Sequence, residues 1–174
     1  MKRLNILMNG HPALRKVAKP VTEEEFNTDQ LNDLISQMSA TLSATKDGVA
    51  LAGPQVGIEK RIFIVHGKVL SEFGYSGHPE MKDSKTGSLA FINPVIIKSS
   101  RQKAWLEEGC LSVPNYFGLV ERSLKVKVSA QDGTGKRFQV IGSRILAQIF
   151  QHEIDHLDGI LFLDKVRELK YVKP

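Results

Sequence analysis

The amino-acid sequence predicts an α+β fold in which antiparallel sheets surround a central buried helix. The predicted elements follow one another as helix, strands, hairpin and helix, an order typical of α+β domains. The segment from Ser143 to about Leu157 is apolar on nearly all sides, which predicts a helix inside the core. Residues 119–131 alternate between apolar and polar, and the turn at 132–135 leads into a return over 136–141, which predicts an antiparallel hairpin.

The first predicted element is a helix over residues 22–45. Thr22 and Glu25 match a capping box, in which two side chains satisfy free N–H groups at the start of a helix. The helix is expected to stop before Asp47-Gly48. Its apolar residues recur at helical spacing and are Leu31, Leu34, Ile35, Met38 and Leu42.

Two strands are predicted between this helix and the hairpin. Residues 61–66 form a continuous apolar run, and residues 88–98 return to that character with an interruption at Asn93-Pro94. The polar, glycine-rich stretch between them, residues 67–87, is expected to be a long loop insertion. Ser143 is expected to cap the final helix, because its hydroxyl can accept from a free N–H of the first turn.

Length and composition indicate a single soluble domain, residues 1–174. Hydrophobic residues make up 41% of the chain and charged residues 25%, which excludes a disordered chain or a coiled coil. The apolar runs are far shorter than the ~20 residues that a membrane helix needs, so we expect no membrane association. Cys110 is the single cysteine, which excludes an intrachain disulfide and favours a reducing compartment, the cytoplasm.

The excess of positive charge is confined to one end of the chain. The whole chain has 24 basic and 19 acidic residues, a net charge of +5. Five basic residues and no acidic residue lie in the first twenty positions, so the remainder sums to zero. Such a terminus could contact an anionic surface such as RNA, but a solvated end accounts for it as well, and DNA binding is not expected. The basic residues are Lys2, Arg3, Arg15, Lys16 and Lys19.

The predicted core helix carries His152-Glu153-Ile154-Asp155-His156, the H-E-x-x-H pattern of metal hydrolases. Four residues along a helix rise about 6 Å and rotate about 40°, so both imidazoles can reach one ion. Glu153 lies about 100° around the axis from His152, where it can contact a water on that ion. Short patterns of this kind also arise by chance. On a buried helix, however, these polar groups cost several kcal/mol without partners, and a metal ion supplies one.

Cys110 is the candidate for a third metal ligand, because a thiolate binds borderline-soft divalent ions well. An isolated cysteine is more often a small buried apolar residue, but a nearby histidine pair favours the ligand interpretation. Residues 48–57 are rich in small residues and contain Gln55. They form either a connecting loop or a segment whose backbone approaches a ligand, with the Gln55 amide donating to an oxyanion.

Taken together and in this chain order, the three segments resemble the three short motifs of the peptide deformylase family. The second motif is complete in Glu108-Gly109-Cys110-Leu111-Ser112, and the third in Gln151-His152-Glu153-Ile154-Asp155-His156. The first motif, over residues 48–55, departs from the family pattern at two positions, since Ala50 replaces a glycine and Gly53 an alanine. The resemblance covers nearly the whole chain.

The resemblance implies a metal-dependent hydrolase that removes the formyl group from the N-terminal formylmethionine of nascent polypeptides and releases formate. Cys110, His152 and His156 would bind one divalent ion, usually Fe(II) in this family and often replaced by Zn or Ni. A metal-bound water would be the nucleophile, and Glu153 would be the general base and then the general acid.

The same resemblance implies the remaining site residues. Gln55 and the backbone N–H of Leu111 would stabilise the oxyanion, and Arg122 would brace Glu108. The alternative for this last pair is an exposed ion pair worth little. If position 50 needs a positive φ, Ala50 would cost roughly 1–2 kcal/mol. The residues expected to contact the substrate are Gly48, Val49, Ala50, Glu108, Gly109, Ile145 and Ile149.

Two other functions compete with this interpretation. A zinc endopeptidase would use the same helix and need a downstream ligand, for which Asp158, Asp164 and Glu168 are the candidates, although none has the spacing of known third ligands. An RNA-binding protein would use the basic N-terminus and keep only a structural metal. The formylmethionyl ends of nascent chains are the expected partners. The sequence does not indicate whether the protein is a monomer or a dimer. The ribosome is a further candidate partner, but we expect no long C-terminal tail to support docking on it.

Overall fold

The computed structural model describes residues 2–73, 75 and 87–173. The strands within this part are β1 (Ala50–Ala52), β2 (Ile62–His66), β3 (Ser88–Ser99), β4 (Lys103–Cys110), β5 (Val113–Ser123), β6 (Lys125–Gln131), β7 (Arg137–Ser143) and β8 (Leu169–Tyr171). The helices are α1 (Asp29–Ser43), α2 (Gly67–Glu72) and α3 (Ile145–Leu157). Short 3-10 helices are η1 (Pro12–Arg15), η2 (Glu23–Glu25), η3 (Gly53–Val56) and η5 (Phe162–Asp164).

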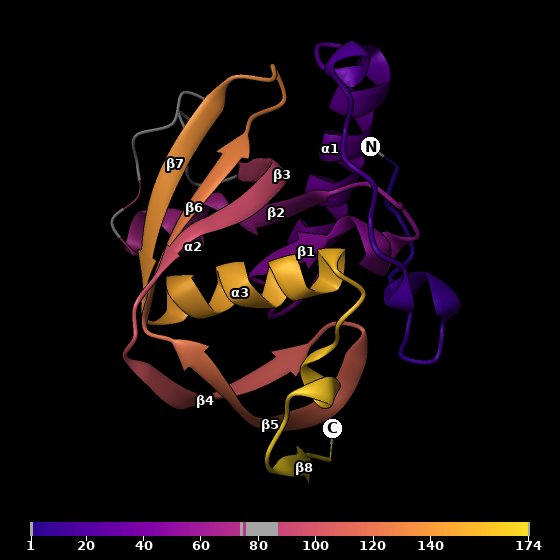
Figure 1. Ribbon diagram of the computed structural model, residues 1–174. Coiled ribbons are helices and arrows are strands. Elements are labelled where there is room, and N and C mark those ends of the chain that lie inside the picture. The colour runs from indigo at the N-terminus through magenta and orange to yellow at the C-terminus, as the bar shows by residue number, and fades with distance from the viewer. Residues whose placement is uncertain (1, 74, 76–86, 174) are drawn as a thin grey trace.

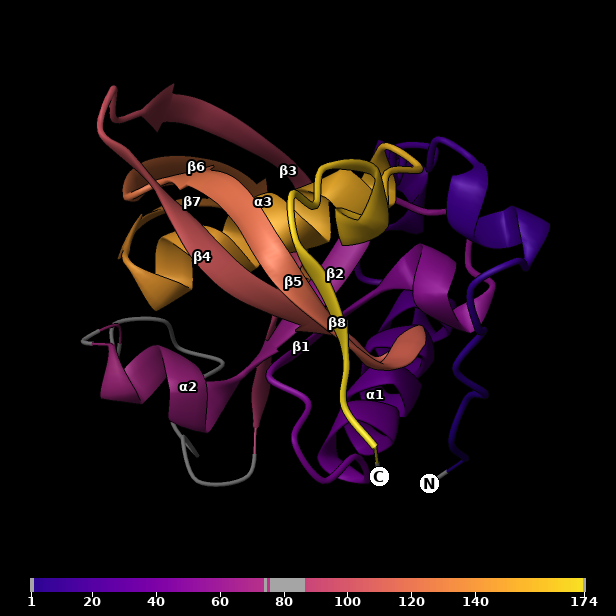
Figure 2. The same cartoon turned by 90° about the horizontal axis from the view of Figure 1, so that it is seen from below.

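The strands form two antiparallel sheets with α3 lying between them (Figure 1). The larger sheet has the order β1-β2-β3-β6-β7, and the smaller has the order β4-β5-β8. Seen from below, β8 runs beside β5 on the small sheet (Figure 2). This arrangement confirms the predicted α+β class and places the H-E-x-x-H helix between the sheets.

Both faces of the larger sheet are covered, because alternate residues of β2 enter different core clusters. On the α3 side, Phe63 and Phe91 stack with ring centroids 4.7 Å apart, and Phe150 of α3 lies 5.1 Å from Phe91. On the opposite side, α1 packs its buried residues on the sheet. That second cluster includes Leu31, Met38, Leu42, Leu51, Ile62 and Ile64. The sheet therefore holds α3 in place through a packed aromatic core.

The first helix is shorter than predicted. It begins at Asp29, where the Thr28 hydroxyl accepts from the Leu31 N–H at 3.3 Å, and it ends at Ser43. The capping box of Thr22 and Glu25 is present, but it closes the separate 3-10 helix η2. The prediction of one helix over 22–45 was wrong because a cap signal defines a helix start without fixing how far the helix continues.

The segment predicted as one strand, 119–131, belongs to two strands that meet at Leu124. The Leu124 N–H donates to Gln102 O at 3.0 Å, and its carbonyl accepts from the Arg144 N–H at 2.8 Å, which separates β5 from β6. The hairpin from β6 to β7 is confirmed. In its turn, Asp132 Oδ1 accepts from the backbone N–H groups of Thr134 and Lys136. The sequence analysis did not identify β1, β4, the first half of β5, or β8.

Residues 67–87 were expected to be a loop throughout, but their first part is the helix α2, with the His66 side chain at its N-terminus. The positions 74 and 76–86 of the expected loop lie outside the described residues.

Helix α3 begins one residue later than the predicted Ser143 cap implies. Ser143 is the last residue of β7, and the N-cap is Arg144, whose φ of 51° turns the chain from strand to helix without a side-chain hydrogen bond. The helix is also less uniformly buried than predicted, because Ile145 is half exposed. None of the described helices is long and apolar enough to span a membrane.

The close contact between β5 and the C-terminal segment makes Gly118 sensitive to substitution. A Cβ at this position would lie 2.2 Å from Val166 Cγ2 and 2.5 Å from the Glu168 carbonyl oxygen. We expect Gly118→Ala to lower the free energy of unfolding by about 1–3 kcal/mol, because the backbone must shift. Urea denaturation measures this change. Ser129→Ala on β6 is the control, expected within about 0.5 kcal/mol of wild type, and equal stability of the two variants would contradict the packing described.

Candidate metal centre and active site

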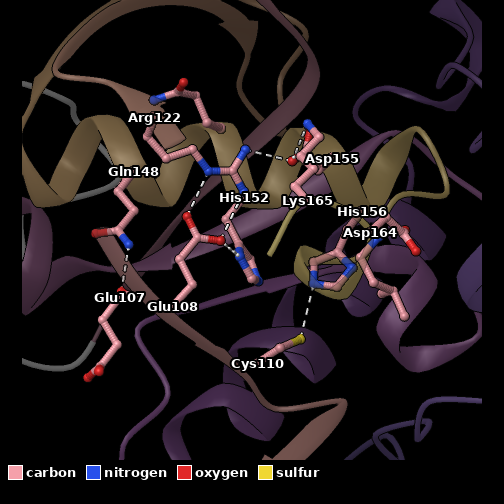
Figure 3. Close-up of polar contacts among 12 residues, drawn as sticks. Glu107, Glu108, Cys110, Arg122, Gln148, His152, Asp155, His156, Asp164 and Lys165 are labelled. Carbon is pink, nitrogen blue, oxygen red and sulfur yellow. Dashed lines mark hydrogen bonds and ion pairs between the residues drawn. The ribbon is translucent and has the colours of Figure 1, made fainter. Parts of the chain in front are cut away.

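Cys110, His152 and His156 converge at one point between α3 and the small sheet. The two histidines lie one turn apart on α3, and Cys110 is the last residue of β4. One ligand atom from each residue lies within 4.8 Å of the others, and Cys110 Sγ is 3.3 Å from His156 Nε2 (Figure 3). The structure thus brings together the three residues that the sequence predicted as metal ligands.

This group of donors fits a divalent transition metal. One sulfur and two imidazole nitrogens are a donor set for such ions, and ligands on one tetrahedral ion lie roughly 3.5 Å apart. Burial lowers the pKa of His156 well below its usual value, so its imidazole is in the neutral form that binds metals. The pKa of His152, in contrast, is raised. Burial acts to lower it, but hydrogen bonds with Cys110 and Glu108 have the larger combined effect. A metal ion therefore competes with a proton at His152.

His152 is oriented by a buried ion pair. The imidazole Nδ1 lies 2.9 Å from Glu108 Oε2. Arg122 donates to both oxygens of that carboxylate, from Nε to Oε1 at 2.7 Å and from Nη2 to Oε2 at 2.9 Å. The side chains of Glu108 and Arg122 are 2% and 3% exposed, so the predicted pair is present and the exposed alternative is wrong. Burial alone raises the pKa of Glu108, but the hydrogen bonds from Arg122 and His152 lower it to about 2.

Glu153 is buried beside the histidines, and its Oε2 has no hydrogen-bond partner among the described residues. Burial raises the pKa of this carboxyl to about 7, with the charge of His152 opposing the shift and that of Glu108 adding to it. A carboxyl group with a pKa near neutrality can both accept and release a proton at neutral pH.

The amide of Gln55 is fixed in one orientation. Its Oε1 accepts from the Ala52 N–H at 2.8 Å, so its Nε2 points towards Ser112 Oγ at 3.2 Å and Cys110 Sγ at 3.4 Å. Leu111 follows Cys110 in the turn between β4 and β5 and lines the same pocket. A donor therefore lies beside the candidate metal ligands.

A pocket of about 460 Å³ opens in front of these groups. The predicted substrate-contacting residues all line it, with the segment 48–50 contributing one part and Ile145 and Ile149 of α3 another. The other predicted residues in its lining are Gln55, Glu108, Gly109, Cys110, Leu111, His152 and Glu153. The pocket thus connects two of the candidate metal ligands, Cys110 and His152, with the segment that departs from the family motif.

The two departures from that motif have different structural settings. Ala50 lies in the extended strand β1 and has no positive φ, so the strain considered for an alanine here does not arise. A Cβ at Gly53 would lie 2.9 Å from the carbonyl oxygens of both Ile58 and Lys60. In this chain, glycine is therefore the residue that fits position 53 without movement of the backbone.

Several residues of the site were missed by the sequence analysis. Gln148 precedes His152 by one helical turn, lines the pocket and donates to the Glu107 carbonyl oxygen at 2.8 Å. Helical spacing alone would have placed it beside His152. Asp155 and Lys165 contact each other and extend the Arg122 ion pair. Their contacts join α3 to β5 and to the segment after η5, which no local pattern indicates. Asp47, which was also missed, lines the pocket. Asn115 and Phe117 line it too, and they belong to segment 115–118, where the sequence departs from many relatives and Phe117 was expected to form an apolar rim.

Two of the three downstream acids considered for the endopeptidase alternative are engaged elsewhere. Asp158 pairs with Arg61, and Asp164 pairs with Arg15. Part of the basic N-terminus is engaged as well, since Lys16 pairs with Glu59.

We expect Arg122→Leu to lower the free energy of unfolding by about 3–5 kcal/mol, because it leaves the Glu108 carboxylate buried without its charged partner. The double variant Arg122→Leu/Glu108→Gln removes that charge and should recover part of the loss. Urea denaturation of the wild type and the three variants, including Glu108→Gln alone, measures the coupling. Additive effects of the two substitutions would contradict a buried, coupled pair.

Comparison with known proteins agrees with this geometry. The family model described as polypeptide deformylase matches residues 3–172. A peptide deformylase from Heliobacterium modesticaldum is 44% identical over 162 residues, which cover 92% of each chain. The crystal structure of peptide deformylase from Thermotoga maritima has a TM-score of 0.79 and 36% identity, covering 97% of this chain and 100% of that one. A Met-Ala-Ser-bound peptide deformylase from Acinetobacter baumannii has a TM-score of 0.78 and 34% identity, covering 94% of this chain and 98% of that one.

These matches extend over nearly the whole chain and include the segments that form the pocket. They exclude the endopeptidase alternative, because the fold, the motif order and the relatives agree on another hydrolase. The chain, a metal-dependent hydrolase that removes the formyl group from the N-terminus of nascent peptides, belongs to the polypeptide deformylase family.

Proposed function

We propose that Cys110, His152 and His156 hold the divalent ion of this deformylase and that Glu153 transfers the protons of the reaction. The observation that carries this proposal is the convergence of three ligand atoms within 4.8 Å of one another. The buried carboxyl of Glu153, on the same helix and in the same pocket, supports it. We further propose Fe(II) as the ion, as the family resemblance implies. Zn or Ni are proposed as substitutes, because a thiolate and two imidazoles accept all three ions.

When bound, a divalent ion lowers the pKa of a coordinated water and polarises a carbonyl oxygen. Glu153 is proposed to accept a proton from the water that attacks the formyl carbon. As the carbon–nitrogen bond breaks, Glu153 returns that proton to the departing amine, so formate and a free N-terminus leave. A pKa of about 7 suits both transfers, because the group has to be basic in one step and acidic in the next.

Gln55 is proposed to stabilise the negative charge that develops on the formyl oxygen. Its Oε1 is already bound to the Ala52 N–H, so its Nε2 is held beside Cys110, next to the proposed ion. The backbone N–H of Leu111 is proposed as the second donor, since Leu111 lines the pocket directly after Cys110.

The substrate is proposed to lie along β1 with its methionine side chain between segment 48–50 and the α3 residues Ile145 and Ile149. Strand β1 is at the edge of the larger sheet, so a peptide could add to it as a further strand. Binding of Met-Ala-Ser by the relative from Acinetobacter baumannii supports a peptide with an N-terminal methionine. Because such peptides arise during protein synthesis, we propose the cytoplasm as the place of action.

Glu153→Gln tests the assigned base. The amide cannot accept the proton, so we expect the rate of formate release from formyl-Met-Ala-Ser to fall by at least about 10²–10⁴-fold. Metal content and thermal unfolding should stay close to wild type. Glu121→Gln, which removes a carboxylate from the surface pair with Lys103, is the matched control and should keep full activity. If Glu153→Gln retained the wild-type turnover rate, the assignment of Glu153 as the general base would be contradicted.

The charges at the pocket predict a preference among substrates. Asp47 and Glu107 line the pocket, and no lysine or arginine joins them among the lining residues that the structure describes. We expect kcat/KM to be about 2–5-fold higher for formyl-Met-Lys-Ser than for formyl-Met-Asp-Ser at low salt, with the difference shrinking as salt is added. The double variant Asp47→Asn/Glu107→Gln should abolish the preference, whereas Glu121→Gln should keep it. A preference that survives in the double variant would contradict this origin.

A further inference from the structure

The ion pair that orients His152 continues beyond Arg122 to the protein surface. Arg122 Nη1 lies 2.7 Å from Asp155 Oδ2, and Lys165 Nζ lies 2.7 Å and 2.8 Å from the two oxygens of Asp155. Figure 3 shows the side chains in one continuous series from His152 through Glu108, Arg122 and Asp155 to Lys165. The last two residues have no role in the reaction proposed above.

Asp155 binds the one nitrogen of the Arg122 guanidinium that Glu108 does not contact. Arg122 Nε and Nη2 donate to the two oxygens of Glu108, and Nη1 donates to Asp155 Oδ2. The planar guanidinium is thereby held at both ends, and its fixed plane fixes the plane of the Glu108 carboxylate. Glu108 Oε2 in turn contacts His152 Nδ1. The orientation of that imidazole therefore depends on the contact between Arg122 and Asp155, which lies three residues further along α3.

Lys165 balances the charge of this buried group. Glu108 and Asp155 carry two negative charges, and Arg122 and Lys165 carry two positive charges. The side chains of the first three residues are 2%, 13% and 3% exposed, so solvent screens them little. Without Lys165, the Arg122 guanidinium would be the single cation bound to the two carboxylates of this group. Its attraction to Asp155 would then increase and its hydrogen bonds to Glu108 would weaken.

The backbone at Lys165 is held by the fold, and its 39% exposed side chain reaches from there to Asp155. It directly follows η5, and its backbone N–H donates to the Phe162 carbonyl oxygen at 3.0 Å. Phe162 is buried against Val113 and Val120 of β5, and Asp164 pairs with Arg15. Lys165 therefore differs from Lys103, whose pair with Glu121 is about half exposed on both sides.

We propose that Asp155 and Lys165 are positioning residues for His152, through which the segment after α3 sets the strength and geometry of metal binding. The inference rests on the proposed role of His152 as a metal ligand. It predicts that a charge on the outside of the molecule changes the properties of an ion bound inside it.

Lys165→Gln tests the proposal, with Lys165→Arg as the conservative variant and Lys103→Gln as the matched control for loss of a surface ion pair. The probe is Co(II) added to metal-free protein, and the readouts are its dissociation constant by chelator competition and its d–d absorption spectrum. Changes in the hydrogen-bond partners of metal ligands typically cost 10–100-fold in affinity. Because Lys165 acts through intervening residues, we expect a loss of about 10-fold and an altered d–d spectrum. Lys165→Arg should restore both, and Lys103→Gln should match wild type.

Asp155→Asn provides a second variant and should weaken Co(II) binding at least as much as Lys165→Gln. Thermal unfolding of the metal-free proteins separates positioning from stability. If Lys165→Gln lowers the unfolding temperature but leaves the Co(II) affinity and spectrum unchanged, the contact is only structural and the proposal is overturned. The metal site itself predicts that wild-type Co(II) protein shows a thiolate charge-transfer band and that Cys110→Ser loses it. Absence of this band from the wild type would contradict the metal site, so the two failures can be told apart.

Discussion

The buried contact between Arg122, Glu108 and His152 is the interaction on which the site depends. It joins β5, β4 and α3, three elements that approach one another only in the folded chain. Because Glu108 and Arg122 are almost fully buried, neither can lose the other without leaving a charge in the core. The same contact therefore couples the position of a proposed metal ligand, His152, to the packing of the small sheet against the helix.

The larger sheet makes that contact rigid from the other side. Phe150 of α3 packs on the stacked pair Phe63 and Phe91, so the helix cannot rotate without disturbing the aromatic core. Polar groups then occupy the side of α3 that faces the small sheet and the pocket. The site is thus formed where one side of the helix is tightly packed and apolar and the other is polar, with His152 paired to Glu108 and with Glu153 Oε2 and His156 Nδ1 unpartnered among the described residues.

The sequence predicted the site better than it predicted the boundaries of the elements. His152, Glu153 and His156 lie close in sequence on one helix, so spacing alone describes their geometry. Cys110 and Gln55 were candidates because of their chemistry, and the resemblance favoured the same roles for them. Strands β1 and β8 were missed because each has only three residues, too few to show a periodic pattern. Asp155 was visible in the motif, but its partner Arg122 comes from a distant strand, and such pairs follow from tertiary packing alone.

The brevity of β1 has a consequence for turnover. An edge strand of three residues offers an added peptide only a few main-chain hydrogen bonds, each worth about 1 kcal/mol net. Even a millimolar complex requires about 4 kcal/mol. Backbone pairing alone therefore leaves a peptide loosely held, whatever its sequence. In the proposed binding mode, recognition would then rest on the methionine side chain and the formyl group, and the processed chain would dissociate quickly once formate has left.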